Sequence, residues 1–352
     1  MLASLKVFWI ARCKRVWVAM LLCGLGVGVE LCFSPPPSAE ANLSNFLVGG
    51  RRNQGGRSAN RQKGGGVRAG RLNGGFDSRI PYVITPRNTF EASDQFTIRW
   101  QAVAGVETYT VRLWQWEDAN GGRQQVVWQT TTSGTAVRYS GTPPLATEAF
   151  YAVEVITDQG VSSDLDAGCA IAGFAVLFPE TRSRLQADLE AIDLTTLSPE
   201  EQALARAEVY LNYQMLDAAI ATLAEQLALT PTDTLYLALG DFYSLAGLNT
   251  LARVHYTQAL ELATANRDDL WRAIALEGLG EVAVMGNDLA AALPYLRQAQ
   301  LSYGLANVPL QANQVKDRID LLETAQRLGI PPTDEPQVCV TAPLAPNPPL
   351  QP

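Results

Sequence analysis

Histidine and cysteine, the side chains that most often carry catalysis or bind metals, are scarce in this sequence. His255 is the only histidine, and its position within a helical pattern suits a packing role. Three of the five cysteines, Cys13, Cys23 and Cys32, lie in the apolar N-terminal region. There is no histidine–cysteine cluster with metal-ligand spacing, no glycine-rich turn between a strand and a helix, and no G-x-S-x-G motif. The sequence therefore predicts no catalytic, metal or cofactor site, and we expect that the protein is not an enzyme.

The two remaining cysteines, Cys169 and Cys339, could form one disulfide in an oxidising compartment. The alternative is that Cys169 is a small buried hydrophobe and Cys339 an incidental residue of the C-terminal tail. A disulfide therefore requires that the protein be exported.

The N-terminus has the pattern of an export signal. Basic residues up to Arg15 precede an apolar run from Val16 to Val29, and Ala39-Glu40-Ala41 supplies a cleavage site of the A-x-A type. The apolar run is shorter than the roughly 20 residues of a membrane-spanning helix. We therefore predict a signal peptide over residues 1–41 and export to the periplasm or cell envelope. The alternative is an uncleaved membrane anchor.

Residues 42–80, which we call the basic arm, are rich in glycine, arginine, asparagine and serine. Eight Lys/Arg and one Asp give this arm a charge of 8 − 1 = +7, whereas residues 81–352 hold 15 Lys/Arg and 32 Asp/Glu, so 15 − 32 = −17. Because it has little apolar surface to bury, the arm is predicted to be disordered. It is either a solvated linker or a contact for an anionic envelope polymer or an acidic protein surface, and export argues against nucleic acid.

From residue 81 to residue 178 the sequence alternates β-branched or aromatic residues with polar ones, as in Phe96 to Trp100. Short strands at this spacing predict a two-sheet β-sandwich. Trp100 lies on an early strand, residues 109–113 read Tyr-x-Val-x-Leu, and Leu145 lies six residues before Tyr151. In these features the segment resembles a fibronectin type III-like domain. The resemblance implies a corner hydrogen bond from the late tyrosine, although the proline usual in that corner is missing.

Three tryptophans are candidates for an outer surface of this sandwich. If Val111 and Leu113 face the core, Trp114 and Trp116 point the other way, and Trp128 on the next strand could lie nearby. Exposed tryptophans stack on sugar rings or bind a protein partner. The alternative is that they pack against the helical domain or the basic arm.

After Pro179 the apolar period changes to that of helices, and Ser198-Pro199-Glu200-Glu201 marks a helix start. A repeat follows, with copies at about 200–232, 233–272 and 273–306 and a capping helix at 310–328, within an array spanning 179–330. The second copy has Tyr236, Leu239-Gly240, Tyr243, Ala252, Tyr256 and Ala259, and the third has Leu276, Leu279-Gly280, Ala283, Ala292, Leu296 and Ala299.

These positions resemble the tetratricopeptide repeat family. The resemblance implies antiparallel helix pairs stacked into a right-handed α-solenoid, so the fold class is multidomain, all-β followed by all-α. In this family the first helix of each pair lines a binding groove. The groove residues would be Glu208, Leu211, Leu237, Asp241, Leu245, Glu277, Glu281, Val284 and Met285.

This predicted groove is acidic with apolar patches, so its ligand is expected to be a basic or amphipathic segment of a protein or peptide. One candidate is already in the chain, because residues 51–71 of the basic arm could dock there within or between molecules. The alternative is a solvated acidic face without a ligand.

The expected function is that of an exported, non-enzymatic adaptor that binds a protein or peptide through the helical repeats. The alternative is a cell-wall or carbohydrate-binding module that uses the sandwich tryptophans and the basic arm. Residues 331–352 are rich in proline and predicted to be disordered. The whole organisation resembles exported envelope repeat proteins of cyanobacteria.

Overall fold

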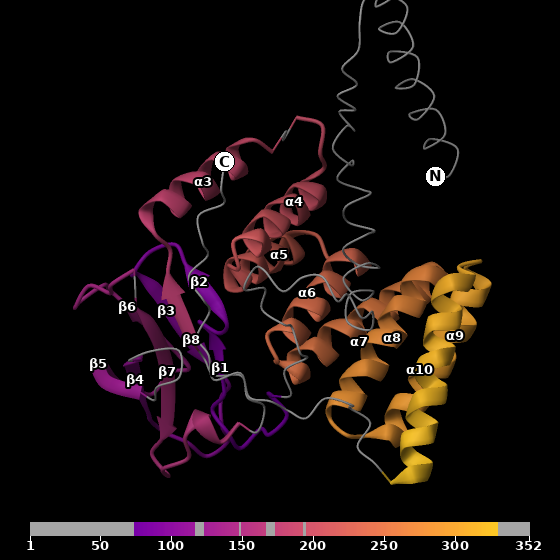
Figure 1. Ribbon diagram of the computed structural model, residues 1–352, viewed down its shortest axis with the longest axis horizontal. Coiled ribbons are helices and arrows are strands. Elements are labelled where there is room, and N and C mark those ends of the chain that lie inside the picture. Colours follow the sequence, from indigo (N-terminus) through magenta and orange to yellow (C-terminus); the bar gives the residue numbers. More distant parts are fainter. Residues whose placement is uncertain (1–73, 117–122, 148, 167–172, 193–194, 330–352) are drawn as a thin grey trace, which may run out of the picture. The chain divides into compact units, whose positions relative to one another are not determined.

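The computed structural model describes residues 74–116, 123–147, 149–166, 173–192 and 195–329 (Figure 1). The predicted signal peptide, the basic arm up to residue 73 and the proline-rich tail lie outside the described residues. Cys169 and Cys339 also lie outside them, so the possible disulfide stays a prediction.

The described strands all precede residue 177 and form two sheets. One sheet has the order β1-β3-β6 and the other the order β2-β8-β7-β4-β5. Neighbouring strands are antiparallel except β2 and β8, which are parallel. The strands are β1 (Val83–Thr85), β2 (Thr89–Glu91), β3 (Phe96–Trp100), β4 (Tyr109–Trp116), β5 (Arg123–Thr132), β6 (Ala136–Tyr139), β7 (Phe150–Thr157) and β8 (Gly173–Val176).

The burial pattern of the strands follows from the alternation of apolar and polar residues in the sequence. In β3, Phe96, Ile98 and Trp100 are buried while Thr97 and Arg99 are exposed, because successive side chains of a strand point to opposite faces. The inner faces pack aromatic rings edge to face, as between Phe96 and Phe174, whose centroids are 4.8 Å apart. This confirms the predicted antiparallel β-sheet region before the helices.

Tyr151 makes the hydrogen bond that was expected of the late tyrosine. The amide of Ala146 donates to the Tyr151 hydroxyl oxygen at 2.8 Å. Tyr151 begins the buried stretch of β7, and its ring packs against Phe174 of β8. The bond therefore ties the connection before β7 to the sandwich core.

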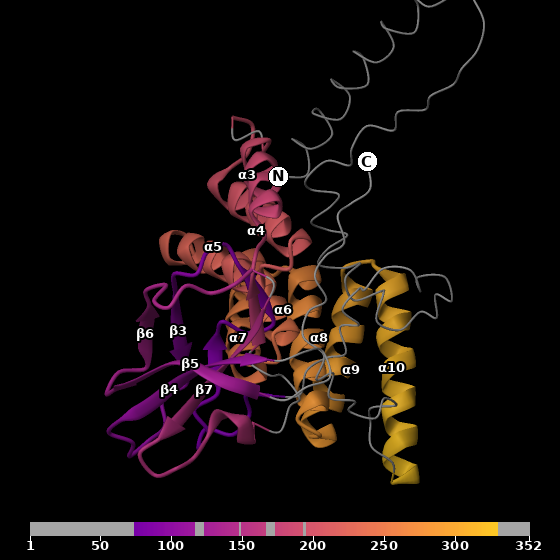
Figure 2. The ribbon, with the colours of Figure 1, turned by 60° about the vertical axis from the view of Figure 1, so that its left-hand side comes forward.

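The helices follow the sandwich, and Figure 2 shows α6 to α10 in colours that run from orange to yellow. No helix among residues 179–192 and 195–329 is both long enough and apolar enough to cross a membrane. The helices are α3 (Pro179–Glu190), α4 (Pro199–Asn212), α5 (Leu216–Leu229), α6 (Asp233–Leu245), α7 (Asn249–Asn266), α8 (Asp269–Met285), α9 (Leu289–Leu305) and α10 (Pro309–Leu328).

The helix boundaries have local causes. Ser198 caps α4 with its side chain while Glu201 bonds back to the Ser198 amide, which completes the predicted capping box. The turns α4–α5, α6–α7 and α8–α9 each contain one residue with positive φ, namely Gln214, Gly247 and Asn287. Such a residue reverses the chain sharply at a helix C-terminus, so each helix packs antiparallel to the next.

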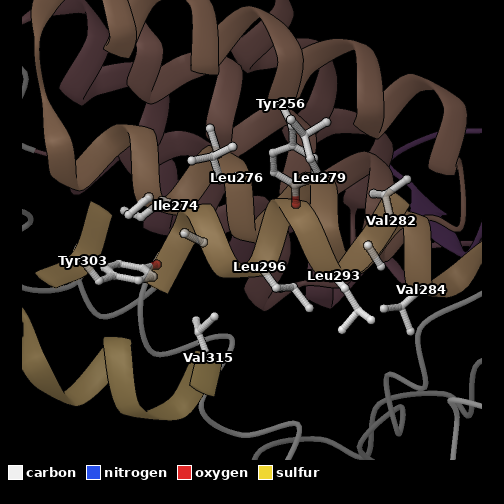
Figure 3. Packing of buried hydrophobic residues seen from close by; sticks show 14 of the residues in the cluster. Tyr256, Ile274, Leu276, Leu279, Val282, Val284, Leu293, Leu296, Tyr303 and Val315 are labelled. Carbon is white, nitrogen blue, oxygen red and sulfur yellow. The ribbon is translucent and has the colours of Figure 1, made fainter. Parts of the chain in front are cut away.

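The largest helical core lies between α6 and α10. Figure 3 shows side chains of this cluster, among them Leu279 of α8 and Leu296 of α9. Leu296 and Val315 are buried, so α9 packs on α8 and α10 packs on α9. This confirms the predicted helical region after the strands, and α10 covers residues 310–328, where the capping helix was predicted.

The sandwich and the first helices share a hydrogen-bonded junction. Arg87, in the turn after β1, is 1% exposed. Its guanidinium donates to the carbonyls of Val83 and Ala246 and to the Asp166 carboxylate, at 3.0, 2.9 and 3.2 Å. The amide of Phe90 on β2 also donates to the carbonyl of Gln214, between α4 and α5. Backbone groups of both parts therefore bond to each other.

Candidate partner-binding surface on the helical array

The first helices of the repeats, α4, α6 and α8, approach their neighbours at small residues. A Cβ added to Gly240 of α6 or to Gly278 of α8 would lie 2.6 Å from the Tyr256 ring of α7. The ring therefore occupies space that only glycine leaves open on both helices. Tyr256 is 3% exposed, and its hydroxyl donates to Oδ1 of Asp241 at 2.5 Å.

An acidic residue directly follows a buried small residue in each first helix. Because the small residues mark equivalent positions of the repeat, the acids that follow them occupy equivalent positions as well. The pairs of a small residue and the acid that follows it are Ala207–Glu208, Gly240–Asp241 and Gly280–Glu281. A fourth acid, Glu277, lies on α8 one turn before Glu281. All four acids are half-buried. We call Glu208, Asp241, Glu277 and Glu281 the acidic column.

Neighbouring helices hold these carboxylates in place. The hydroxyl of Tyr303 on α9 donates to Oε2 of Glu277 at 2.6 Å. Arg318 of α10 donates to both carboxylate oxygens of Glu281, at 3.0 and 3.1 Å. Glu281 thus accepts a bidentate, charge-assisted pair of hydrogen bonds from a guanidinium. Asp241 and Glu277 are the acids of the column that tyrosine hydroxyls hold in position.

Glu208 has a different environment. Burial raises the pKa of its carboxyl above the usual value, because desolvation disfavours the charged form. A cation near Glu208 would favour the ionised carboxylate. The charge of Glu208 therefore depends on what approaches it.

The predicted apolar groove residues divide into two groups. Leu237 and Val284 belong to the hydrophobic core of α6 to α10, and Met285 is also buried. Leu211 is half-buried and Leu245 is exposed. Glu208, Asp241 and Glu281 thus occupy equivalent positions on successive first helices, while the buried leucine and valine contribute to helix packing. A partner-binding role for any of these residues stays a prediction.

Tyr303 and Arg318 were not recognised from the sequence. Tyr303 lies 26 residues from Glu277, and Arg318 lies 37 residues from Glu281. Helical periodicity relates positions a few residues apart, so it gives no indication of these pairs. Tyr256 was recognised as a repeat position, but the contact of its hydroxyl with Asp241 was not.

His255 packs between two tyrosines of α6. Its ring stacks on Tyr243 at a centroid distance of 5.1 Å and lies 5.9 Å from Tyr236. Burial lowers the pKa of His255 to about 4, so the imidazole is neutral at pH 7. Among the described residues no group of three or more His, Cys, Asp or Glu side chains could hold a metal ion. His255 thus packs as the sequence predicted.

The sandwich tryptophans do not share one surface. Trp128 of β5 lies opposite Leu113 of β4, and residues directly opposite each other point to the same face. Its ring meets Tyr139 edge to face at 5.3 Å on the inner side of the sandwich. The expectation that Trp128 lies beside Trp114 and Trp116 is therefore corrected, because the strand register sets its direction.

Trp114 belongs to a polar network on the outer face. Its Nε1 donates to Oε2 of Glu154 at 2.9 Å, and Nη1 of Arg112 lies 3.6 Å from the same oxygen. Ser162 donates to the other carboxylate oxygen of Glu154. Trp114 and Trp116 are both half-buried. Their contact with a sugar or a protein stays a prediction.

Comparison with known proteins supports the repeat assignment. A family model described as tetratricopeptide repeat matches residues 231–300. Residues 231–300 are thus similar to tetratricopeptide repeats. The match spans α6, α7, α8 and most of α9, which carry Asp241, Glu277 and Glu281. Tetratricopeptide repeats generally bind protein partners and typically form non-enzymatic scaffolds. No curated protein matches the chain.

Proposed function

We propose that this protein is an exported, non-enzymatic adaptor that binds a basic or amphipathic segment of a partner protein at the acidic column. The observation that carries the proposal is the repetition of a half-buried carboxylate at one position of three successive first helices. Hydrogen bonds from tyrosines position two acids of the column before any partner arrives. Positioned acceptors reduce the entropy that is lost on binding.

Charge determines the proposed chemistry of the partner. Residues 195–329 contain eight Lys/Arg and 16 Asp/Glu, so their net charge is 8 − 16 = −8. Arginine or lysine side chains of a partner would form charge-assisted hydrogen bonds with Asp241 and Glu277. Exposed Leu245, on α6 with Asp241, offers an apolar contact beside them. A segment with basic and apolar residues matches both features.

The other parts of the chain have supporting roles in this proposal. The two sheets and the Tyr151–Ala146 hydrogen bond support a fibronectin type III-like sandwich, which would act as a spacer or second binding surface. The export pattern of residues 1–41 supports a location in the periplasm or cell envelope. The order of export signal, basic arm, sandwich and helical repeats is the basis for the proposed similarity to exported cyanobacterial envelope repeat proteins.

Affinity capture with two matched variants tests the proposal. The full chain, the variant D241N/E277Q and the control E225Q/E261Q are used to capture proteins from the native envelope fraction. Both variants remove two negative charges, but Glu225 and Glu261 are exposed on the second helices α5 and α7. We expect a protein that is captured by the full chain and the control and lost with D241N/E277Q. Equal capture by all three chains would contradict the proposal.

A further inference from the structure

The chain enters the described structure at a defined place on the helical array. The carbonyl of Gly74 accepts hydrogen bonds from the amide and the side-chain amide of Asn249, at 3.3 and 3.0 Å. The carbonyl of Gly75 accepts from the Thr250 hydroxyl at 2.5 Å, and its amide donates to Asp166 at 3.0 Å. Residues 74 and 75, near the C-terminal end of the basic arm, are therefore held at the start of α7.

These two glycines suit their positions. A Cβ on Gly74 would lie 2.9 Å from both Arg87 Nη2 and Asp166 Oδ2, and Gly75 has a φ of +71°. Both residues are buried. A larger side chain at either position would push the arm away from α7. Glycine at both positions therefore allows the arm to contact the start of α7 closely.

The next residue extends this contact to the third repeat. A Cβ on Gly286, at the end of α8, would lie 3.3 Å from the Phe76 ring. Residues 74 to 76 thus connect the α6–α7 turn with the C-terminal end of α8. The helices that end there, α6 and α8, carry Asp241, Glu277 and Glu281. The carbonyl ends of both helices add negative potential at this site.

The arm is long enough to reach the acidic column. Asp241 precedes Gly247 by six residues, or about 9 Å along a helix. Arg71 precedes Gly74 by three residues, which span up to about 10 Å when extended. Glu277 precedes Gly286, which lies beside the Phe76 ring, by nine residues, or about 14 Å along a helix. Arg68 precedes Phe76 by eight residues, which span up to about 27 Å when extended, so Glu277 is within its reach. Residues 42–73 contain seven Lys/Arg and no Asp or Glu, so their charge opposes that of the array.

We propose that the basic arm, through Arg68 and Arg71, docks on the acidic column of its own molecule and competes there with the partner. This inference rests on the proposed function, because it assigns the same surface to an internal ligand. Attachment at Gly74 gives the arm an effective concentration near the column on the order of millimolar, as for short flexible linkers. A partner must displace the arm, so the arm lowers the apparent affinity of the array.

A competition experiment with the full chain tests this inference. The probe is a fluorescent peptide with the sequence of residues 57–73, and its binding is measured by fluorescence anisotropy. The variant R68E/R71E reverses the two charges nearest to Gly74, and the control R51E/R52E makes the same change farther away. We expect that R68E/R71E binds the peptide on the order of tenfold more tightly than the unmodified chain, and that R51E/R52E changes the affinity less than twofold. Adding D241N/E277Q to R68E/R71E should abolish the gain.

The other outcomes distinguish the two proposals. Equal affinity of the unmodified chain and R68E/R71E, with loss in D241N/E277Q, would overturn arm docking and leave the acidic column as a binding surface. Equal gains in R68E/R71E and R51E/R52E would show a general charge effect and also overturn docking. Absence of peptide binding by every chain, R68E/R71E included, would overturn docking and count against the proposed function.

Discussion

The side chain of Arg87 donates a hydrogen bond to the carbonyl oxygen of Ala246, the residue directly after α6, at 2.9 Å. Arg87 follows β1, so this bond joins the sandwich to the second repeat. A cation at a helix C-terminus is favourable because it meets the negative end of the helix dipole. The same guanidinium pairs with Asp166, whose carboxylate also accepts from the amide of Gly75. One buried arginine therefore connects the sandwich, the array and the end of the basic arm.

Replacing Arg87 with methionine is expected to destabilise the protein strongly. The change leaves the Asp166 carboxylate without its cation and the Ala246 carbonyl without its donor. Breaking a buried ion pair by removing one partner costs about 3–5 kcal/mol. Urea unfolding measures the change in the free energy of unfolding. The control is Arg138→Met on the exposed side of β6, where we expect a change below about 0.5 kcal/mol. A similar, small loss in both variants would contradict the role of Arg87.

Gly240→Ala is expected to destabilise the array, although alanine is the better helix former. The new methyl group would meet the Tyr256 ring at 2.6 Å, and overpacking of a core costs about 1–3 kcal/mol. Gly304→Ala in α9 is the matched control, because no atom lies within 4 Å of its Cβ position. That change should stabilise the protein by about 0.5–1 kcal/mol. Thermal unfolding of the two variants should shift in opposite directions, and shifts in the same direction would argue against the close approach of α6 and Tyr256.

Glu91, on β2 near Asp217 of α5, should make stability decrease as pH rises. Burial and the neighbouring Asp217 carboxylate raise the pKa of Glu91 to about 8. Burial also raises the pKa of Asp217, to about 7, although hydrogen bonds from the Thr85 hydroxyl and the Arg87 amide act to lower it. Glu91 is therefore the carboxyl of the pair that keeps its proton to the higher pH. A carboxyl with a raised folded pKa binds more protons in the folded state. Its contribution is therefore favourable at low pH and is lost between about pH 4.5 and pH 8.

The variant Glu91→Gln removes this titration. We expect the free energy of unfolding of the unmodified protein, relative to that of Glu91→Gln, to fall between pH 5 and pH 8 in urea titrations. The control Glu107→Gln removes one acid from an exposed position, so it separates the loss of a carboxylate in general from the loss of Glu91. Parallel pH profiles of the unmodified protein and Glu91→Gln would refute the assignment of the proton to Glu91.

His255 should act in the opposite pH direction. Its folded pKa of about 4 lies below the ordinary value of 6.5, so the unfolded chain binds the proton more readily. Stability is therefore lost as pH falls from about 6.5 to about 4, by at most about 3 kcal/mol. His255→Phe keeps the ring between Tyr236 and Tyr243 but cannot be protonated. Urea unfolding at pH 7 and pH 4.5 should show a smaller acid loss in this variant, and an unchanged loss would disprove the effect.

The sequence alone determined the features that depend on nearby residues. The alternation of Phe96, Ile98 and Trp100 predicted the half-buried strand β3, and Ser198 with Glu201 predicted the start of α4. The repeat positions, including Gly240 and Tyr256, resemble those of tetratricopeptide repeats, and this resemblance implied stacked helix pairs. These properties are encoded within one turn, one strand or one repeat period, so the printed order of residues is enough to find them.

Only the tertiary structure decided which distant side chains meet. The register of β4 and β5 places Trp128 inside the sandwich rather than beside Trp114. Stacking of α6 to α10 brings Tyr303 to Glu277, and the junction brings Arg87 to Ala246, a separation of 159 residues. Such contacts depend on the relative placement of whole strands and helices. That placement follows from the summed burial of many side chains, which local periodicity does not contain.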